Sequence, residues 1–338
     1  MKFRKRWGAA LTAVLLLSSI VSACGTKTEE TTKVRIGEVT RSIFYAPQYV
    51  ALSQGFFKDE GLDVELTTTP GGDKTMTALL SNAIDVALVG SETSIYVAQQ
   101  GSDDPVINFA QLTQTDGTFL VARKKMDNFD WNSLKGSVFL GQRKGGMPQM
   151  AGEFTLKKHK IDPQKDLQLI QNIEFANIAS AYSSGTGEYV QLFEPQASII
   201  EKEGKGFVIA SFGVESGHLP YTVFMTKQSF MKKNPATVQK FTNAIQRAQL
   251  WVAAKSVDEI TNAVLPYFKD IDVEIVKSVV KRYKDQGSFA TDGVVDEQEW
   301  NNLLDVMSSA GELKQRVEWK TLVDNTYAEK AKSNVKQP

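Results

Sequence analysis

The 338-residue sequence contains almost no cysteine or histidine. Cys24 is the single cysteine, and His159 and His218 are the two histidines. One cysteine cannot form an intramolecular disulfide, so we expect apolar burial to stabilise the fold. Neither histidine stands at metal-ligand spacing from another histidine or cysteine, and His159, within LKKHKI, is expected on a solvated helix face. Because a GxSxG motif is also missing, we predict no catalytic residues, no metal, no cofactor and no enzymatic activity.

The sequence also lacks net charge and long apolar runs. Its 39 lysines and arginines balance 39 aspartates and glutamates. Nucleic acid selects a basic surface, so this balance argues against a nucleic-acid partner. No apolar run reaches the roughly 20 residues that a membrane-spanning helix needs.

The N-terminus has the organisation of a secretory signal peptide. Four of residues 2–6 are basic, and residues 9–21 form a short apolar segment. The following Val21-Ser22-Ala23-Cys24 resembles the bacterial lipobox, whose cysteine is lipidated, for example with palmitate. The alternative, a buried and chemically silent cysteine, fits poorly before a polar tract with little to bury. We therefore predict a lipoprotein signal peptide over residues 1–23, a lipid on Cys24, a polar linker over 24–33, and anchoring on the extracytoplasmic face of the cell membrane.

The first part of the mature chain alternates between strand-like and helix-like segments. Strands are expected over residues 33–39, 62–68 and 84–90, and helices from Pro47, over 71–83 and over 91–101, where Ser91 is a possible N-cap. Such close succession predicts parallel strands with helices on the faces of the sheet.

A second series of strands and helices follows, and then a helical tail. Residues 136–161 repeat the order strand, Gly-rich turn, helix, and further strands are expected over 167–173, 189–196, 206–213 and within 221–230. Helical spacing of apolar residues covers 236–254, 273–286 and 296–311. The tail has no core of its own, so we expect it to pack on the first lobe.

The fold class expected from this organisation is α/β with two lobes, because roughly 305 residues exceed what one core usually serves. The chain then has to cross between the lobes twice. We predict lobe 1 over residues 34–118 and 227–338, and lobe 2 over 119–226. The crossings near 119–123 and 221–226 are expected to act as the hinge.

Several of these segments match a known family. Residues 42–72, SIFYAPQYVALSQGFFKDEGLDVELTTTPGG, and residues 78–96, ALLSNAIDVALVGSETSIY, resemble the N-terminal lobe of bacterial ABC-importer solute-binding proteins of the SsuA/THI5-like (NMT1) family. Residues 120–146 and 190–196, VQLFEPQ, look like the family's second lobe. The family includes binders of alkanesulfonates, taurine, nitrate and thiamine-precursor pyrimidines.

The resemblance implies a type II periplasmic-binding-protein fold, in which two lobes, each a mainly parallel sheet flanked by helices, are joined by two crossover strands and close on a solute. The expected partners are a small-molecule solute, an ABC permease and its cytoplasmic ATPase, and the expected state is a monomer. Two alternatives remain. A sensory receptor domain uses the same fold, but no output module follows the final KSNVKQP. The family's pyrimidine synthase depends on a cysteine-rich motif that this sequence lacks.

Candidate site residues follow the expected strands, because ligands bind beyond the carboxyl ends of parallel strands. The candidate ligand-binding residues are Ser42, Phe44, Tyr45, Gly90, Ser91, Glu92, Thr115, Asp116, Gly145, Gly146, Met147, Phe193 and Glu194, with Gln114 beside them. Purely structural roles are the alternatives: Phe44 and Tyr45 as a staple for the helix, Ser91 as a cap, and Gly145-Gly146 as a turn. The glycine pair does not match the phosphate loop GxxxxGK[ST].

Glu194 bears on the choice of solute. A carboxylate in the cleft repels a sulfonate or nitrate, whereas an aminopyrimidine can meet it with paired hydrogen bonds and stack on Phe44, Tyr45 or Phe193. This favours a nitrogen heterocycle such as a thiamine-precursor pyrimidine. Sulfonate binders of the family can also carry an acidic residue before proline at this position, so an alkanesulfonate, taurine or nitrate stays open.

Overall fold

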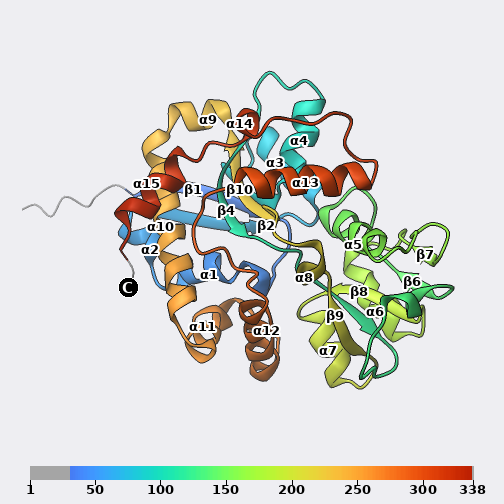
Figure 1. Cartoon of the computed structure of the whole chain (residues 1–338). Coiled ribbons are helices and arrows are strands. Elements are labelled where there is room, and N and C mark those ends of the chain that lie inside the picture. The colour runs from blue at the N-terminus through green and yellow to red at the C-terminus, as the bar shows by residue number, and fades with distance from the viewer. Residues whose placement is uncertain (1–30, 337–338) are drawn as a thin grey trace, which may run out of the picture. The chain divides into compact units, whose positions relative to one another are not determined.

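The computed structural model describes residues 31–336 (Figure 1). The predicted signal peptide over 1–23 and the predicted lipidation site Cys24 lie outside the described residues. The first strand begins at Thr32, so the last two residues of the predicted linker, 32 and 33, belong to this strand. Within residues 31–336, no helix combines the length and apolar composition needed to cross a membrane.

Five strands form the first sheet, in the order β2-β1-β3-β10-β4. They are β1 (Thr32–Glu38), β2 (Leu62–Thr68), β3 (Val86–Gly90), β4 (Val106–Thr113) and β10 (Thr222–Lys227). β1 pairs in parallel with β2 and β3, and β10 runs antiparallel to β3 and β4. The sequence of β3, VALVG, is an unbroken apolar run, as expected for a central strand buried on both faces.

Short helices connect the strands of the first sheet. They are α1 (Ala46–Ser53), α2 (Phe56–Asp59), α3 (Gly72–Leu80) and α4 (Glu92–Gln99), and a 3-10 turn, η1 (Ile43–Tyr45), precedes α1. Pro47 lies in the first turn of α1, as predicted, because proline needs no partner for an N–H there. Gly55 separates α1 from α2 at a φ of 76°, a conformation that glycine adopts without strain. The alternation of strands and helices predicted for this region is confirmed.

The second sheet has the order β7-β6-β8-β5-β9. Its strands are β5 (Thr118–Ala122), β6 (Val138–Leu140), β7 (Gln168–Ile170), β8 (Tyr189–Phe193) and β9 (Phe207–Ser211), and its helices are α5 (Met147–Lys158), α6 (Ile178–Ser183), α7 (Gln196–Lys202) and α8 (Phe212–Ser216). β6 pairs in parallel with β7 and β8, whereas β5 is antiparallel to β8 and β9.

Both sheets are therefore mixed, and the prediction of mainly parallel sheets was incomplete. The two antiparallel strands are β5 and β10, which follow the passages of the chain between the sheets. The chain leaves one sheet where the parallel strands of that sheet end, and it enters the other sheet where the parallel strands of that sheet end. The strand that forms on entry therefore runs antiparallel to its neighbours. β5 and β10 are also full members of their sheets, so the passages between sheets are residues 114–117 and 212–221, beside the predicted crossings.

The C-terminal helices pack largely on the first sheet and its helices. They are α9 (Gln228–Lys233), α10 (Pro235–Ala254), α11 (Val257–Val264), α12 (Val273–Asp285), α13 (Glu297–Ser309), α14 (Trp319–Leu322) and α15 (Thr326–Asn334). As expected for the tail, α10 contacts α1, α2 and α15, and α11 contacts α1 (Figure 1). Two of these helices also contact helices beside the second sheet, since α12 contacts α7 and α13 contacts α5.

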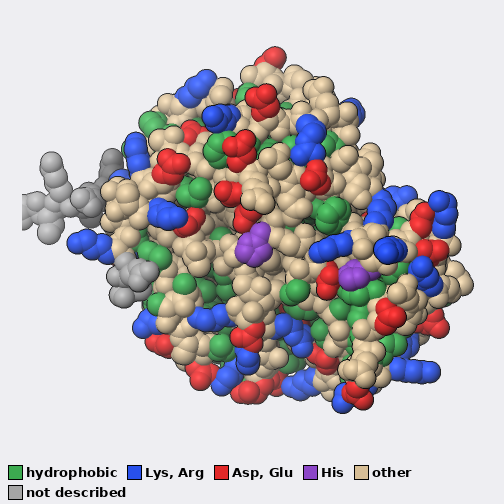
Figure 2. All heavy atoms as spheres, viewed as in Figure 1, with side chains coloured by type: hydrophobic (Ala, Val, Ile, Leu, Met, Phe, Trp, Pro, Cys, Tyr) green, Lys and Arg blue, Asp and Glu red, His purple; other side chains and the backbone are tan. Residues whose placement is uncertain are grey.

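The core and the surface agree with the composition of the sequence, since apolar residues are buried and the surface carries charges of both signs. One core cluster extends from β1 and α10 to Leu140, Met150 and Val190 around the second sheet, and a smaller one lies around Trp131 and Phe139. On the face shown in Figure 2, lysine and arginine side chains are interspersed with aspartate and glutamate.

Candidate functional site

The loops that follow β1 and β3 contact the loops of the second sheet. Phe44 in η1 lies at the centre of this contact, 1% exposed, with ring centroids 6.1 Å from Phe193 and 4.9 Å from Tyr283. Gly117, in the first passage between the sheets, runs directly past these rings. A Cβ atom at Gly117 would stand 2.8 Å from Phe193 and 2.9 Å from Phe44, so only glycine allows this close approach.

Glu92 occupies the first turn of α4 and is bonded across the two sheets. Its Oε1 accepts a hydrogen bond from Met147 N, at the start of α5, at 3.2 Å, while its Oε2 has no partner within the protein. Gly90 permits this arrangement, because a Cβ there would lie 2.1 Å from Oε2. Burial raises the pKa of Glu92 to about 7, and the hydrogen bonds to its carboxylate only partly oppose this.

Asp116 is a second buried carboxylate, in the passage between β4 and β5. Its Oδ1 accepts hydrogen bonds from Thr118 N, at 2.6 Å, and from the Thr118 hydroxyl, and the Tyr221 hydroxyl is a further hydrogen-bond partner of this carboxylate. Burial raises the pKa of Asp116 to about 6. Both carboxylates follow strands of the first sheet, and the solute-binding role predicted for them stays a prediction.

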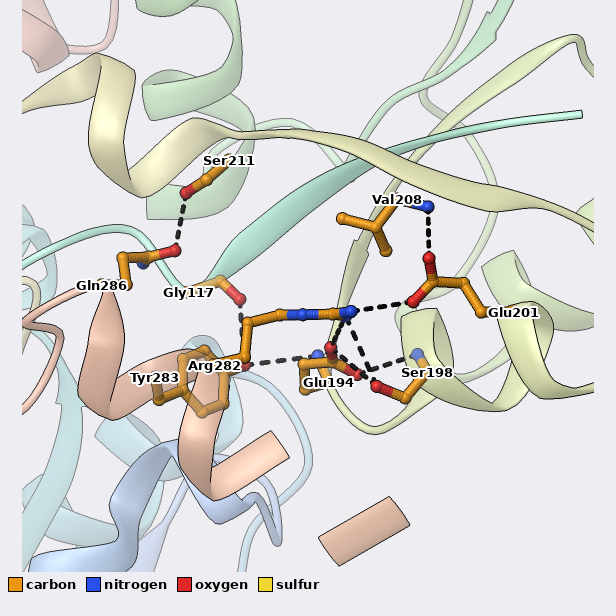
Figure 3. Close-up of polar contacts among 9 residues, drawn as sticks. All are labelled: Gly117, Glu194, Ser198, Glu201, Val208, Ser211, Arg282, Tyr283 and Gln286. Carbon is orange, nitrogen blue, oxygen red and sulfur yellow. Dashed lines mark hydrogen bonds and ion pairs between the residues drawn. The ribbon is translucent and has the colours of Figure 1, made fainter. Parts of the chain in front are cut away.

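Glu194 has a different environment from the one the sequence suggested (Figure 3). One oxygen accepts from Ser198 N at 2.9 Å, and the other accepts from the Ser198 hydroxyl at 3.0 Å and pairs with Arg282. Arg282 also pairs with Glu201 at 2.8 Å. Burial raises the pKa of Glu194, and the Arg282 charge opposes that rise. Because the protein already neutralises Glu194, this residue no longer supports the preference for a nitrogen heterocycle.

Tyr283, the residue after Arg282, also connects α12 to the segment that carries Glu194. Glu194 N donates to the Tyr283 hydroxyl at 3.2 Å, and that hydroxyl donates to Gly117 O at 2.9 Å (Figure 3). Two successive residues of α12, Arg282 and Tyr283, thus bond to Glu194, directly after β8, and Tyr283 also bonds to Gly117, directly before β5. The sequence predicted α12 as a helix, but it gave no indication that Arg282, 88 residues from Glu194, is the partner of that carboxylate.

Three of the predicted hydroxyl residues use their side chains inside the protein. Ser42 Oγ accepts from Phe44 N at 3.2 Å and caps η1. Ser91 lies at the N-cap position of α4, as predicted, but its hydroxyl donates to Pro220 O and makes no hydrogen bond to the first turn of the helix. Thr115 Oγ1 donates to Ser288 Oγ at 3.0 Å.

The remaining predicted residues lie around the contact between the sheets. Tyr45 is 5% exposed, and burial followed by the charges of Glu38 and Glu92 raises its pKa. Gly145 has a φ of 86°, and its carbonyl accepts from the Tyr96 hydroxyl of α4 at 3.2 Å. Gly146 precedes the first turn of α5, and Phe193 is half-buried.

The sequence reasoning missed Tyr221, which is 4% exposed. It had entered only as one end of the predicted crossing over 221–226. Burial raises the pKa of Tyr221, and the charge of Asp116, a hydrogen bond to Asp116 and the charges of Glu92 and Tyr45 raise it further. The Tyr221 and Asp116 side chains therefore lie together.

The histidines lie elsewhere. His159 was expected on a solvated face, but it stacks on Trp131 with centroids 4.5 Å apart, and its Nε2 lies 2.7 Å from Glu215. His218 lines an open groove of about 710 Å³ beside α13, and another groove of about 350 Å³ lies between α10 and α15; neither contains a predicted site residue. Among residues 31–336, no three His, Cys, Asp or Glu side chains gather as metal ligands would.

Comparisons with known proteins agree with this geometry. The model of the NMT1-like family matches residues 27–265. YtlA of Bacillus subtilis (strain 168), named as a binding protein, is 60% identical over 97% of this chain and 98% of its own length.

Two solved structures have the same fold. The nitrate-binding protein NrtA from Synechocystis PCC 6803 aligns with a TM-score of 0.72 and 17% identity, covering 91% of this chain and 90% of its own. The alkanesulfonate-binding protein SsuA from Xanthomonas axonopodis pv. citri, bound to MOPS, aligns with a TM-score of 0.69 and 14% identity, covering 88% and 99%. The resemblance noted in the sequence is thus confirmed, and the chain, with its periplasmic-binding-protein fold, belongs to the NMT1-like family.

Proposed function

We propose that this protein captures a small organic solute outside the cytoplasm and delivers it to the permease of an ABC importer. The observation that carries the proposal is the buried hydrogen bond between Glu92 Oε1 and Met147 N, where helix N-terminal turns from both sheets meet. A site shared by two sheets suits a solute that is enclosed when they approach. The relatives named for nitrate and alkanesulfonate binding support the same role.

The two sheets with their helices are proposed to be lobes that open and close. The hinge in this proposal is residues 114–117 and 212–221, since these are the covalent passages between the sheets. A solute that contacts both sides favours the closed state selectively. Small-angle scattering should show compaction when a bound solute is present, and identical curves with binding demonstrated independently would contradict the proposal.

The solute is proposed to be a nitrogen heterocycle of the thiamine-precursor pyrimidine type, and to be released unchanged. With Glu194 neutralised by Arg282, the support for this preference is the pair of aromatic rings of Phe44 and Phe193 at the contact between the sheets, on which a flat ring can stack. An alkanesulfonate, taurine or nitrate is the alternative within the same role. A thermal-shift panel distinguishes them, because a ligand at 100 times its dissociation constant stabilises the folded state by about 2.7 kcal/mol. Recovery of a chemically altered compound would favour an enzyme instead.

The lipid anchor on Cys24 is a separate proposal, since that residue lies outside the described part of the chain. Cys24→Ser should release the protein to the medium or leave an unprocessed precursor, while unfolding at the same denaturant concentration as wild type. Fractionation with mass spectrometry of the N-terminal peptide tests this. Wild-type protein found wholly soluble and without lipid would rule the anchor out.

A further inference from the structure

Both histidines of the chain lie beside one of the two passages between the sheets, residues 212–221, here called the second passage. His159, directly after α5, has its Nε2 2.7 Å from Glu215 Oε2. His218 has its Nδ1 3.3 Å from Glu299 Oε1 of α13. Since Glu215 and His218 belong to the second passage, this segment supplies one member of each histidine–glutamate pair.

The pair of His159 and Glu215 joins the second passage to elements of the second sheet. The His159 ring stacks on Trp131 with centroids 4.5 Å apart and planes 12° apart. Lys158 Nζ of α5 also donates to Glu215 O at 2.8 Å. The two paired side chains are 28% and 29% exposed, so solvent screens their charges only in part. The ring is therefore held against a fixed neighbour, and its charge acts directly on residue 215.

The pair of His218 and Glu299 joins the second passage to the first sheet. The other oxygen of Glu299 accepts from Gln111 Nε2 of β4 at 3.0 Å, which ties this carboxylate to the first sheet. Asn302, one turn further along α13, donates to the carbonyls of Ser216 at 3.3 Å and His218 at 2.6 Å. The second passage is thus held between α5 on one side and α13 on the other.

The two helices that hold the second passage also contact each other. α13 packs against α5, and Lys157 Nζ of α5 donates to Ser309 O at the end of α13 (Figure 1). α5 belongs to the second sheet and α13 packs on the first. A change in the relative position of the sheets therefore has to stretch one of the histidine–glutamate pairs or bend the segment between them.

The charge of both pairs depends on pH. Histidine is the side chain whose charge ordinarily changes between about pH 5 and 8. The other charged residues around the pairs are Lys157, Lys158, Lys160 and Asp130 on the side of His159, and Asp296, Asp305 and Arg316 on the side of His218. The lysines repel a charged His159, whereas the aspartates of α13 attract a charged His218.

We propose that the two histidine–glutamate pairs make the second passage a pH-sensitive hinge, in which protonation of His159 and His218 favours the arrangement with the two sheets in contact. The inference rests on the opening and closing proposed above. A protonated ring forms a charge-assisted hydrogen bond with its glutamate, which is stronger than the bond of a neutral ring. Loss of the protons frees the second passage to bend, and the sheets then separate more easily.

The test combines small-angle scattering and 1H NMR of the histidine rings on the purified full-length protein without added solute. We expect a smaller radius of gyration at pH 5.5 than at pH 8, with a midpoint that follows the titration of the rings. His159→Gln and His218→Gln assign the two sets of ring signals. The pKa of Glu92 is raised to about 7 and that of Asp116 to about 6, so the response of the hinge is the part that the double histidine variant loses.

Further variants keep the inference testable if a histidine variant folds poorly. Glu215→Gln and Glu299→Gln keep both histidines and remove the charge of their partners, so each should reduce the change in radius of gyration between the two pH values. Lys165→Gln is the matched control, since it removes an ion pair with Asp162, 2.9 Å long, away from the second passage. It should leave the response as in wild type.

The outcomes separate this inference from the proposed function. An unchanged radius of gyration between pH 5.5 and pH 8, while nitrate, taurine or 4-amino-5-hydroxymethyl-2-methylpyrimidine still compacts the protein, overturns the pH-sensitive hinge and leaves the solute-capture role standing. A pH response that the double histidine variant and both glutamate variants retain in full also overturns the hinge. Absence of compaction at either pH and with every compound contradicts both proposals.

Discussion

Two buried carboxylates at the junction of the sheets have opposite surroundings. Glu194 is enclosed by Arg282 and Ser198, so both of its oxygens have partners. Glu92 has one oxygen bonded to Met147 N and the other unpartnered, and no lysine or arginine of the described residues pairs with it. Both glutamates thus connect elements of the two sheets, and the comparison separates a carboxylate whose two oxygens are used within the protein from one that keeps an oxygen without a partner. Residue type alone cannot make this distinction, because both are glutamates that follow strands.

The largest effect on stability should come from removing the positive charge of Arg282 beside Glu194. Arg282→Met leaves Glu194 buried without a counter-charge, and breaking a buried pair in this way lowers the free energy of unfolding by about 3 kcal/mol. Arg316→Met is the matched control, because the Arg316 pair with Asp305 is half-exposed and contributes less than about 1 kcal/mol. Urea denaturation measures both. Equal losses for the two variants would remove the distinction between the clusters.

A smaller effect is expected in the pH dependence of stability that Glu92 causes. The pKa of Glu92 is raised to about 7 in the folded protein, so the contribution of this group to stability is present below its unfolded pKa and is lost as the pH rises to about 7. Glu92→Gln should therefore match wild type near pH 4.5 and be more stable by about 2 kcal/mol at pH 8. Denaturation across this range, without solute, tests the sign. A variant less stable than wild type at pH 8 would contradict it.

The smallest effect concerns the Ser198 hydroxyl, which donates to Glu194 at 3.0 Å. Ser198→Ala keeps Arg282 and the backbone N–H of residue 198, so the free energy of unfolding should fall by only about 1 kcal/mol. Ser133→Ala, at an exposed turn, is the control and should change it by less than about 0.5 kcal/mol. If Ser198→Ala costs as much as Arg282→Met, the hydroxyl and not the arginine is the main partner of Glu194.

Much of the fold could be predicted because it depends on local patterns. Apolar runs such as VALVG, the position of Pro47 and the helical spacing over 273–286 report which faces are buried, and they identified β3, α1 and α12. Position also identified Glu92 and Asp116, since both follow strands of the first sheet.

The pairing of distant residues could not be predicted in the same way. Arg282 reads as one basic residue of an amphipathic helix, and its contact with Glu194 exists only because α12 reaches the second sheet. Tyr221 gains its place from the insertion of β10 between β3 and β4, which no pattern within residues 221–230 indicates. Such contacts depend on how the chain passes between the sheets.

The most direct test of the account is a 13C NMR titration of the Glu92 carboxyl, assigned by its loss in Glu92→Gln, with and without the solute that the thermal-shift panel identifies. The account predicts a pKa near 7 in the solute-free protein, raised by burial, and a shift of that pKa when the solute binds, because a ligand beside a carboxylate changes the balance between its charged and neutral forms. A pKa near 4.5 that does not change when the solute binds would contradict the assignment of Glu92 to the solute.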